Sequence, residues 1–241
     1  MAAAESLYIH FSWKKFRHLV TTSPNDTTNP LYHVSIRSTI GPHVIIRYPA
    51  TDGIIGTGTL HAFSISPRYS LRSRPGQLKA LARLRTEYNH ISHTFDPSGK
   101  PHSMRWTSSS GFKSWDFLCL DEHDNAVARF SASIWSATKV GRIDFLDAKI
   151  AGNEAFREEM LLLGLTLYYC MWFRTYNVFN IAGSIFTNTK PLDKDGAVDG
   201  RELKALGRAD SRLSIADEAG LVGEGNGQGG QSRYAPRLNR A

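Results

Sequence analysis

The sequence has little cysteine and no long apolar run. Only Cys119 and Cys170 occur among 241 residues, and both lie among apolar neighbours, which excludes a disulfide framework and predicts small buried side chains in a reducing compartment. The longest apolar or near-apolar run, residues 160–173, has 14 residues, whereas a membrane-spanning helix needs roughly 18 to 20. The N-terminal residues also lack the basic and apolar segments of a secretory signal. We therefore expect a cytoplasmic protein without a transmembrane span, either free or peripheral at a membrane.

The common motifs of catalysis and cofactor binding are missing as well. The sequence contains no G-x-S-x-G, the usual setting of a serine nucleophile. Residues 53–58, GIIGTG, lack the ending of a phosphate-binding loop, and a turn with close strand packing explains these glycines better. His90 and His93 form an H-x-x-H pair without nearby cysteines, which favours surface-loop histidines over a zinc site. We predict that the protein is not an enzyme and holds no cofactor.

Short segments of β type fill most of the first 150 residues. In residues 31–37, LYHVSIR, the side chains of Tyr32, Val34 and Ile36 fall on one side of a strand and polar ones on the other. The acidic turn at residues 121–125, DEHDN, has the length of a hairpin loop, so its flanking strands are expected to pair antiparallel. Many short strands with turns between them indicate an antiparallel barrel or sandwich. The further strand segments are residues 43–48, 56–65, 114–120, 126–132 and 141–148.

A helix follows the strands. Residues 160–173 are apolar on all sides, Asn153 is a suitable N-cap, and acidic residues such as Glu154 suit the positive end of a helix dipole. A helix that is hydrophobic all round is buried on all sides, and among strands it belongs inside a barrel. We therefore predict a mainly β fold, a closed antiparallel β-barrel with a hydrophobic central C-terminal α-helix.

A run of basic residues is the clearest candidate for binding. No acidic residue occurs between Pro67 and Thr86, and the chain carries a net charge of +7. Such a patch attracts phosphates of lipid head groups or nucleic acid, although a solvated loop is an equally good explanation. Within this run, Leu78, Leu81 and Leu84 recur at a spacing of three, which predicts a basic amphipathic helix over residues 77–85. The basic residues are Arg68, Arg72, Arg74, Lys79, Arg83 and Arg85.

The C-terminal part, residues 178–241, is expected to be a polar and mostly disordered tail. Residues 191–202, PLDKDGAVDGRE, match most positions of an EF-hand calcium loop, but Pro191 occupies the first ligand position and no entering helix precedes it. A polar linker with alternating aspartates is therefore favoured over a calcium site. The candidate calcium ligands are Asp193, Asp195, Asp199 and Glu202.

The order of the motifs resembles a known family. LYHVSIR, HVIIRY, MRW, WDFLCLDEHDNAVARF and GRIDFLDA occur in this order before an apolar closing helix, and this set is similar to the tubby C-terminal-like domains of fungi. Its most specific part is the hairpin whose second strand reads Ala128, Arg129, Phe130. The resemblance covers roughly residues 7–177, with residues 67–100 as a basic insert. It implies a barrel threaded by a helix, as in plant LURP-one-related proteins, phospholipid scramblases and tubby, which binds phosphoinositides.

Charge and resemblance together predict a non-enzymatic module that binds an anionic phospholipid head group, phosphoinositide-like, or a membrane surface. The six basic residues would supply the charge, and the leucine stripe would touch the interface. The alternative is a protein-interaction scaffold with an acidic protein partner and no lipid ligand. Insertion of the closing helix into a membrane is a third, less favoured reading, and nucleic acid is not favoured as a partner.

Overall fold

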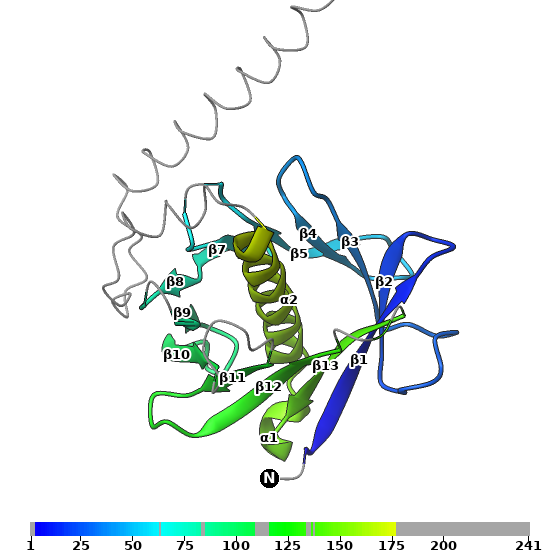
Figure 1. Ribbon diagram of the computed structural model, residues 1–241. Coiled ribbons are helices and arrows are strands. Elements are labelled where there is room, and N and C mark those ends of the chain that lie inside the picture. Colours follow the sequence, from blue (N-terminus) through cyan, green and yellow to red (C-terminus); the bar gives the residue numbers. More distant parts are fainter. Residues whose placement is uncertain are drawn as a thin grey trace, which may run out of the picture.

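The structure is a computed structural model, and it describes residues 3–62, 64–82, 85–108, 116–133, 136 and 138–176. These residues form a mainly β structure with two helices (Figure 1). The strands are β1 (Glu5–Ser12), β2 (Arg17–Thr21), β3 (Tyr32–Ile36), β4 (Val44–Arg47), β5 (Ile54–Thr59), β6 (Arg68–Leu71), β7 (Arg74–Gln77), β8 (Lys79–Ala80), β9 (Glu87–Ser92), β10 (His102–Thr107), β11 (Asp116–Leu120), β12 (Ala126–Ala132) and β13 (Lys139–Phe145), and the helices are α1 (Ala148–Ala151) and α2 (Glu154–Tyr176).

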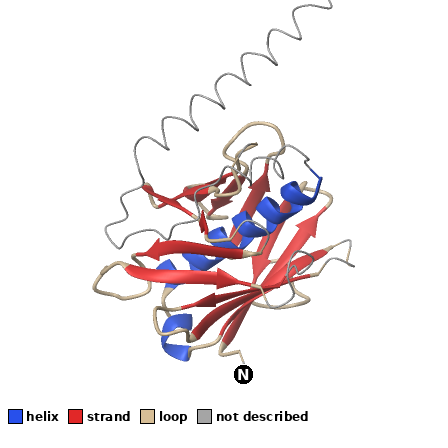
Figure 2. Cartoon of the chain, turned by 60° about the vertical axis from the view of Figure 1, so that its left-hand side comes forward, coloured by secondary structure: helices blue, strands red, loops and turns tan. Residues whose placement is uncertain are grey.

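The strands form one antiparallel sheet in which nearly every strand pairs with its neighbour in the sequence. The order is β7-β6-β5-β4-β3-β2-β1-β13-β12-β11-β10-β9-β8. The first and last strands meet, since Leu7 of β1 lies opposite Ile143 of β13. Consecutive antiparallel strands can be joined by short turns, because the chain only has to reverse its direction between them. The result is an up-and-down arrangement that curls around a single helix (Figures 1 and 2).

One extended segment brings the two edges of this sheet together. Only Leu78 separates β7 from β8 in the chain, yet the two strands have different partners. β7 pairs with β6, where Gln77 lies opposite Arg68, and β8 pairs with β9, where Lys79 lies opposite Asn89. The segment therefore borders β6 with its first half and β9 with its second. This arrangement makes the sheet a nearly closed barrel.

The fold predicted from the sequence is confirmed. The alternating residues of the LYHVSIR segment form β3, and Tyr32 and Val34 point to the buried side as expected. The strands on either side of the 121–125 turn are β11 and β12, which pair antiparallel. Cys119 and Cys170 are both buried and free. Burial raises the pKa of the Cys170 thiol to about 11, so the thiol stays protonated at neutral pH.

Helix α2 is the core of the barrel. Every residue from 158 to 167 is buried, and α2 contacts β4, β5 and β6 on one side and β12 and β13 on another. Asn153 caps the helix, because its Oδ1 accepts a hydrogen bond from the backbone N–H of Phe156 at 3.2 Å. Neither α2, with its 23 residues, nor any other helix in the described part of the chain combines the length and hydrophobicity needed to cross a membrane.

Two glycines of β5 let α2 approach the sheet. A Cβ atom at Gly56 would lie 2.8 Å from Cδ2 of Leu162, and a Cβ atom at Gly58 would collide with the side chain of Thr166. Separations this short do not occur between real side chains, so any larger residue would push the helix away. Two of the three glycines of the GIIGTG motif are thus explained by close packing of a strand against a helix.

The predicted amphipathic helix over residues 77–85 is wrong. Gln77 ends β7, Lys79–Ala80 is β8, and Leu78 between them is fully buried. The leucine stripe therefore cannot touch a membrane through Leu78, while Leu84 lies outside the described residues. A spacing of three fits a helix, but pairing with β6 on one side and β9 on the other favours the extended form. Residues 67–100, expected as an insert, supply β6 to β9 of the sheet.

Candidate functional site

The barrel has two ends that differ in chemistry. In an up-and-down sheet alternate turns lie at the same end. The end where α2 begins carries the β4–β5, β6–β7 and β9–β10 connections, and Tyr48 contacts Glu158 there. The end where α2 finishes carries the β1–β2 turn, the β3–β4 loop and the β8–β9 connection, and His18 contacts Tyr169 there. We refer to these as the N-terminal end and the C-terminal end of the barrel.

At the N-terminal end a buried carboxylate is held by two side chains. Glu158 is fully buried; its Oε1 accepts a hydrogen bond from the Tyr48 hydroxyl at 2.6 Å, and its Oε2 accepts one from Nε of Arg72 at 2.9 Å. The hydrogen bond to Glu158 raises the pKa of Tyr48. Burial is the largest single influence on the pKa of Arg72 and acts to lower it, but the charge of Glu158 and its hydrogen bond to Arg72, with a contribution from Tyr48, together raise that pKa. The carboxylate thus has the partners that a buried charge requires.

Arg72 reaches Glu158 from a strained turn. Arg72 and Ser73 join β6 to β7 and have φ values of 47° and 67°. Positive φ at both central positions is the geometry of a type I′ turn, which usually takes Asn-Gly because other residues are strained there. The ion pair with Glu158 holds Arg72 in this conformation, so the hairpin is fastened to the start of α2.

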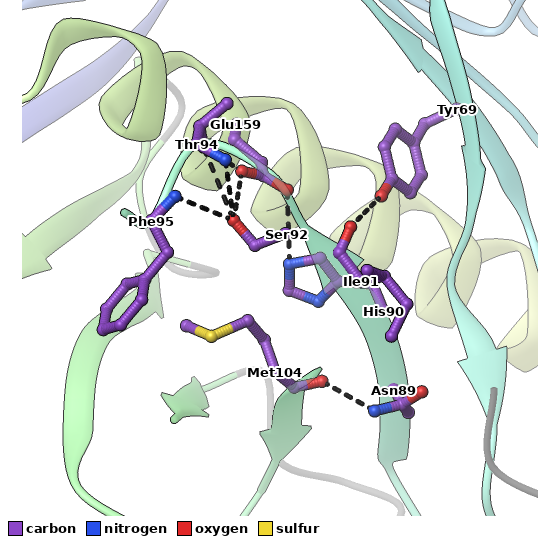
Figure 3. Close-up of polar contacts among 9 residues, drawn as sticks. All are labelled: Tyr69, Asn89, His90, Ile91, Ser92, Thr94, Phe95, Met104 and Glu159. Carbon is purple, nitrogen blue, oxygen red and sulfur yellow. Dashed lines mark hydrogen bonds and ion pairs between the residues drawn. The ribbon is translucent and has the colours of Figure 1, made fainter. Parts of the chain in front are cut away.

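A second buried carboxylate, Glu159, fastens α2 to β9 (Figure 3). The hydroxyl of Ser92 donates to Oε2 of Glu159 at 2.7 Å, and the hydroxyl of Thr94 donates to the same oxygen. Nε2 of His90 lies 3.5 Å from Oε1 of Glu159. Burial and the Glu159 charge raise the pKa of nearby Tyr69. Because Ser92 donates directly to the carboxylate, the imidazole does not receive its proton, and this is not the arrangement that activates a serine nucleophile.

The H-x-x-H pair was predicted to lie in a surface loop, and this is wrong for His90. His90 is a fully buried residue of β9, while His93 follows the strand and is partly buried. The two side chains do not form a joint site, and no cluster of three or more metal-ligating side chains occurs in the described part of the chain. The candidate calcium ligands Asp193, Asp195, Asp199 and Glu202 lie outside the described residues.

The structure separates the basic residues of the 68–85 run. Arg72 and Arg74 are exposed at the β6–β7 turn, at the N-terminal end of the barrel. Arg85 is exposed at the C-terminal end, one residue before Thr86, whose hydroxyl contacts the sulfur of Met171 near the end of α2. The run therefore does not form a single patch. Of the remaining three, Arg68 is partly buried in β6, Lys79 is buried in β8 and Arg83 lies outside the described residues.

The hairpin signature Ala128-Arg129-Phe130 is also given a role by the structure. Arg129 lies on the outer face of β12, where its guanidinium binds Asp144 of β13 with an N–O distance of 2.9 Å. Arg142 contacts the same carboxylate, and the Ser6 hydroxyl donates to it at 2.7 Å. Asp144 is almost fully buried beneath these side chains. The cluster joins β1, β12 and β13, where the first and last of the described strands pair.

The C-terminal end exposes aromatic and basic side chains together. Trp13 and Phe16 in the β1–β2 turn are 64% and 77% exposed, and Lys14 and Lys15 between them are exposed too. Large apolar side chains beside cations are unusual on a surface that has no partner. We call this surface the aromatic–basic rim, and its members are Trp13, Lys14, Lys15, Phe16, Arg37, Ile40, Arg85 and Trp172.

A pocket of about 430 Å³ lies at the base of the β1–β2 turn. Its lining includes Trp13 and His10 of the first hairpin, Asn25 and Thr27 of the β2–β3 loop, and Lys139 of β13. His10 is only 7% exposed, and its Nε2 has no hydrogen-bond partner among the described residues. Burial lowers the pKa of His10, against a backbone hydrogen bond at Ser23 that raises it. The lining of the pocket thus combines a cation, Lys139, with neutral donors.

The pocket and the aromatic–basic rim were not predicted from the sequence. Residues 13–17, WKKFR, alternate large aromatic and basic side chains, and residues 6–25 contain no acidic residue. That pattern is a signal for a surface that meets an apolar and anionic partner. It was overlooked because the run at residues 68–85 contains more cations. The pocket itself has no signal in the sequence, since its lining comes from three separate segments.

Comparison of the chain with models of known families, with curated proteins and with solved structures finds no match. The resemblance to tubby-like domains therefore stays a prediction that the motif order supports.

Proposed function

We propose that the protein is a non-enzymatic module that binds an anionic phospholipid head group, with the C-terminal end of its barrel facing the membrane. The observation that carries this proposal is the pocket beside the aromatic–basic rim. It places Lys139 and His10 in the lining of one cavity at the basic end. The resemblance to tubby-like domains supports the same class of ligand.

The pocket suits a phosphorylated head group in size and chemistry. Its volume falls within the range of small-molecule sites, about 300 to 1,000 Å³. Lys139 offers a charged donor, Asn25 and Thr27 offer neutral ones, and Trp13 forms an apolar wall. A phosphate needs donors of this kind, and the carbon part of a head group needs the apolar wall. The acidic residue of the same loop, Asp26, accepts hydrogen bonds from the N–H and the hydroxyl of Thr28 through one carboxylate oxygen, Oδ1.

The rim supplies the longer-range attraction. Lys14, Lys15, Arg37 and Arg85 are exposed at the same end, and each basic residue close to an anionic leaflet contributes about 1 kcal/mol of attraction that salt weakens. Of the six residues predicted from the sequence, Arg85 belongs to this surface. Arg74 and Arg72 point to the other end of the barrel and serve as internal controls for the orientation.

Vesicle sedimentation tests the proposal. The full chain is mixed with vesicles of phosphatidylcholine alone, with added phosphatidylserine, or with added phosphoinositide. We expect binding only to the two anionic compositions. Lys139→Gln is expected to weaken it about fivefold, because one cation is lost at the head group. Lys149→Gln removes the same charge from an exposed site in α1, at the N-terminal end, and is expected to change binding less than about twofold.

Two results would refute the proposal. Equal binding to neutral and anionic vesicles would exclude an anionic ligand, and no binding to any vesicle would favour the protein-interaction scaffold. If Lys139→Gln and Lys149→Gln weakened vesicle binding equally, the pocket would not be part of the binding site. A larger loss from Arg74→Gln than from Arg85→Gln would reverse the proposed orientation.

A further inference from the structure

The β1–β2 turn exposes two aromatic rings that the fold could have buried. Ser12 and Arg17 pair at the end of the hairpin, and the four residues between them form the turn. Both rings are mostly exposed, and both contact a third aromatic ring. The Phe11 ring lies edge-on to Trp13 at 4.9 Å and to Phe16 at 5.5 Å. Phe11 thus supports both exposed rings from the barrel side.

The exposed Phe16 also has an unusual backbone conformation. Its φ is 48°, and a bulky residue with positive φ is a real outlier because its Cβ crowds the backbone. Glycine or asparagine would fill this position without strain. Strained residues of this kind concentrate at sites that contact ligands. The turn therefore holds a phenyl ring in the solvent at a cost to the stability of the folded chain.

The charged residues that neighbour the two rings in the sequence are all basic. Lys14 and Lys15 lie between the rings, Arg17 follows them, and the nearest acidic residues in the sequence are Glu5 and Asp26. An acidic bilayer offers both partners for this pattern, with anionic phosphates for the cations and an apolar layer below for the rings. Tryptophan in particular favours the level of the head groups, where its ring is buried and its N–H stays solvated.

We propose that the β1–β2 turn is a membrane anchor, in which Trp13 and Phe16 enter the interfacial layer of an acidic bilayer while Lys14 and Lys15 stay at the phosphates. This inference rests on the proposed function and adds an apolar contact to it. Ile40 and Trp172 are exposed at the same end of the barrel. High salt separates the ionic from the apolar contribution to membrane binding, because salt screens the attraction of the lysines but not the insertion of the rings.

Fluorescence quenching tests the insertion directly. The full chain is bound to vesicles of phosphatidylcholine and phosphatidylserine whose acyl chains carry bromine, which quenches nearby indoles. We expect quenching of the wild type, relative to unbrominated vesicles. The Trp13→Phe variant is expected to bind equally well and to lose most of the quenching. This comparison assigns the signal to one indole among five tryptophans.

Binding in high salt tests the energetic role of the rings. The double variant Trp13→Ser, Phe16→Ser is expected to bind at least about tenfold more weakly, because two large apolar side chains no longer leave water. Ile54→Ser is the matched control, because Ile54 is 57% exposed in β5 at the N-terminal end, and it is expected to leave binding unchanged. All variants are exposed-site changes, and circular dichroism checks that each stays folded.

The outcomes separate this inference from the proposed function. Binding to acidic vesicles without quenching, and with no loss in the double variant, would refute the anchor and leave head-group binding intact. No binding of the wild type would refute both. If the double variant instead converts a dimer into a monomer in sedimentation analysis, the turn is an interface between two copies of the chain and the anchor is refuted.

Discussion

The two ends of the barrel use their polar and apolar side chains in opposite ways. At the N-terminal end, Glu158 and Glu159 are buried and nearly every oxygen has a donor, supplied by Tyr48, Arg72 and the β9 region. At the C-terminal end, the aromatic–basic rim turns large apolar rings and cations toward the solvent. The same strands run between both ends, so the sheet itself does not impose the difference.

This contrast shows how one barrel can separate stability from recognition. Charged groups that are buried must be paired, and their partners then fix the position of the helix. Apolar groups that are exposed cost stability, and they persist where another surface covers them. The N-terminal end therefore holds α2 in place, and the C-terminal end is free to meet the proposed membrane. Three measurements test this division.

The largest effect is expected from a charge in the middle of the helix that joins the ends. Leu165→Arg places an unpaired cation at a fully buried position. This costs several kcal/mol. The cost is comparable to the whole free energy of unfolding of a domain, about 5 to 15 kcal/mol. We expect loss of the cooperative urea transition, and the same for Leu163→Arg. Trp172→Arg, at an exposed site of the same helix, is expected to change the free energy of unfolding by about 1 kcal/mol or less. A normal transition in Leu165→Arg would show that α2 is not the core.

Acid is expected to act through a buried histidine at the C-terminal end. Burial lowers the pKa of His18 from 6.5 to about 4 in the folded chain. Between these two pH values the ring is neutral in the folded chain and protonated in the unfolded chain. The contribution of His18 to the free energy of unfolding is fully present above pH 6.5. As the pH falls to 4, protonation of the unfolded chain lowers that free energy by roughly 3 kcal/mol. Urea unfolding between pH 8 and pH 4.5 measures this slope. His18→Gln is expected to flatten it, and an unchanged slope in that variant would assign the loss to other groups.

The smallest of the three effects compares one cation from each end. Arg72→Met leaves the buried Glu158 with Tyr48 as its remaining partner, and because 49% of the Arg72 side chain is exposed, water replaces part of the lost contact. We expect a loss of about 1 to 3 kcal/mol in the free energy of unfolding. Lys15→Met makes the same charge change at the rim and is expected to cost about 0.5 kcal/mol or less. Equal losses would mean that the two ends do not differ in the way described.

The sequence predicted those parts of the fold that follow a simple period. Tyr32 and Val34 alternate with polar residues, the apolar run of α2 has no polar face, and Asn153 stands where a cap is needed. Each pattern has one cause, namely which face of an element is buried. These local rules were enough to predict a barrel around a helix.

The parts that failed depend on contacts between distant segments. Lys79 and Gln77 are polar, yet they are buried between β6 and β9, and no local pattern reveals that an extended segment closes a barrel there. His90 is polar too, and its burial depends on Glu159, 69 positions later in the chain. The candidate site failed for the same reason. Its lysines and aromatic rings are visible in the sequence, but the pocket exists only after β1, β2 and β13 have come together.

The position of α2 at the end of the domain has a consequence for how the chain is made. All thirteen strands of the described residues precede it, so on the ribosome the inner face of the sheet is synthesised before the helix that packs against it. At about 5 to 20 residues per second, the 23 residues of α2 take roughly one to five seconds to appear. During that interval the inward apolar side chains of the strands lack the helix against which they pack in the folded protein. The nascent chain therefore exposes the most apolar surface, and is most prone to aggregate, just before it can fold.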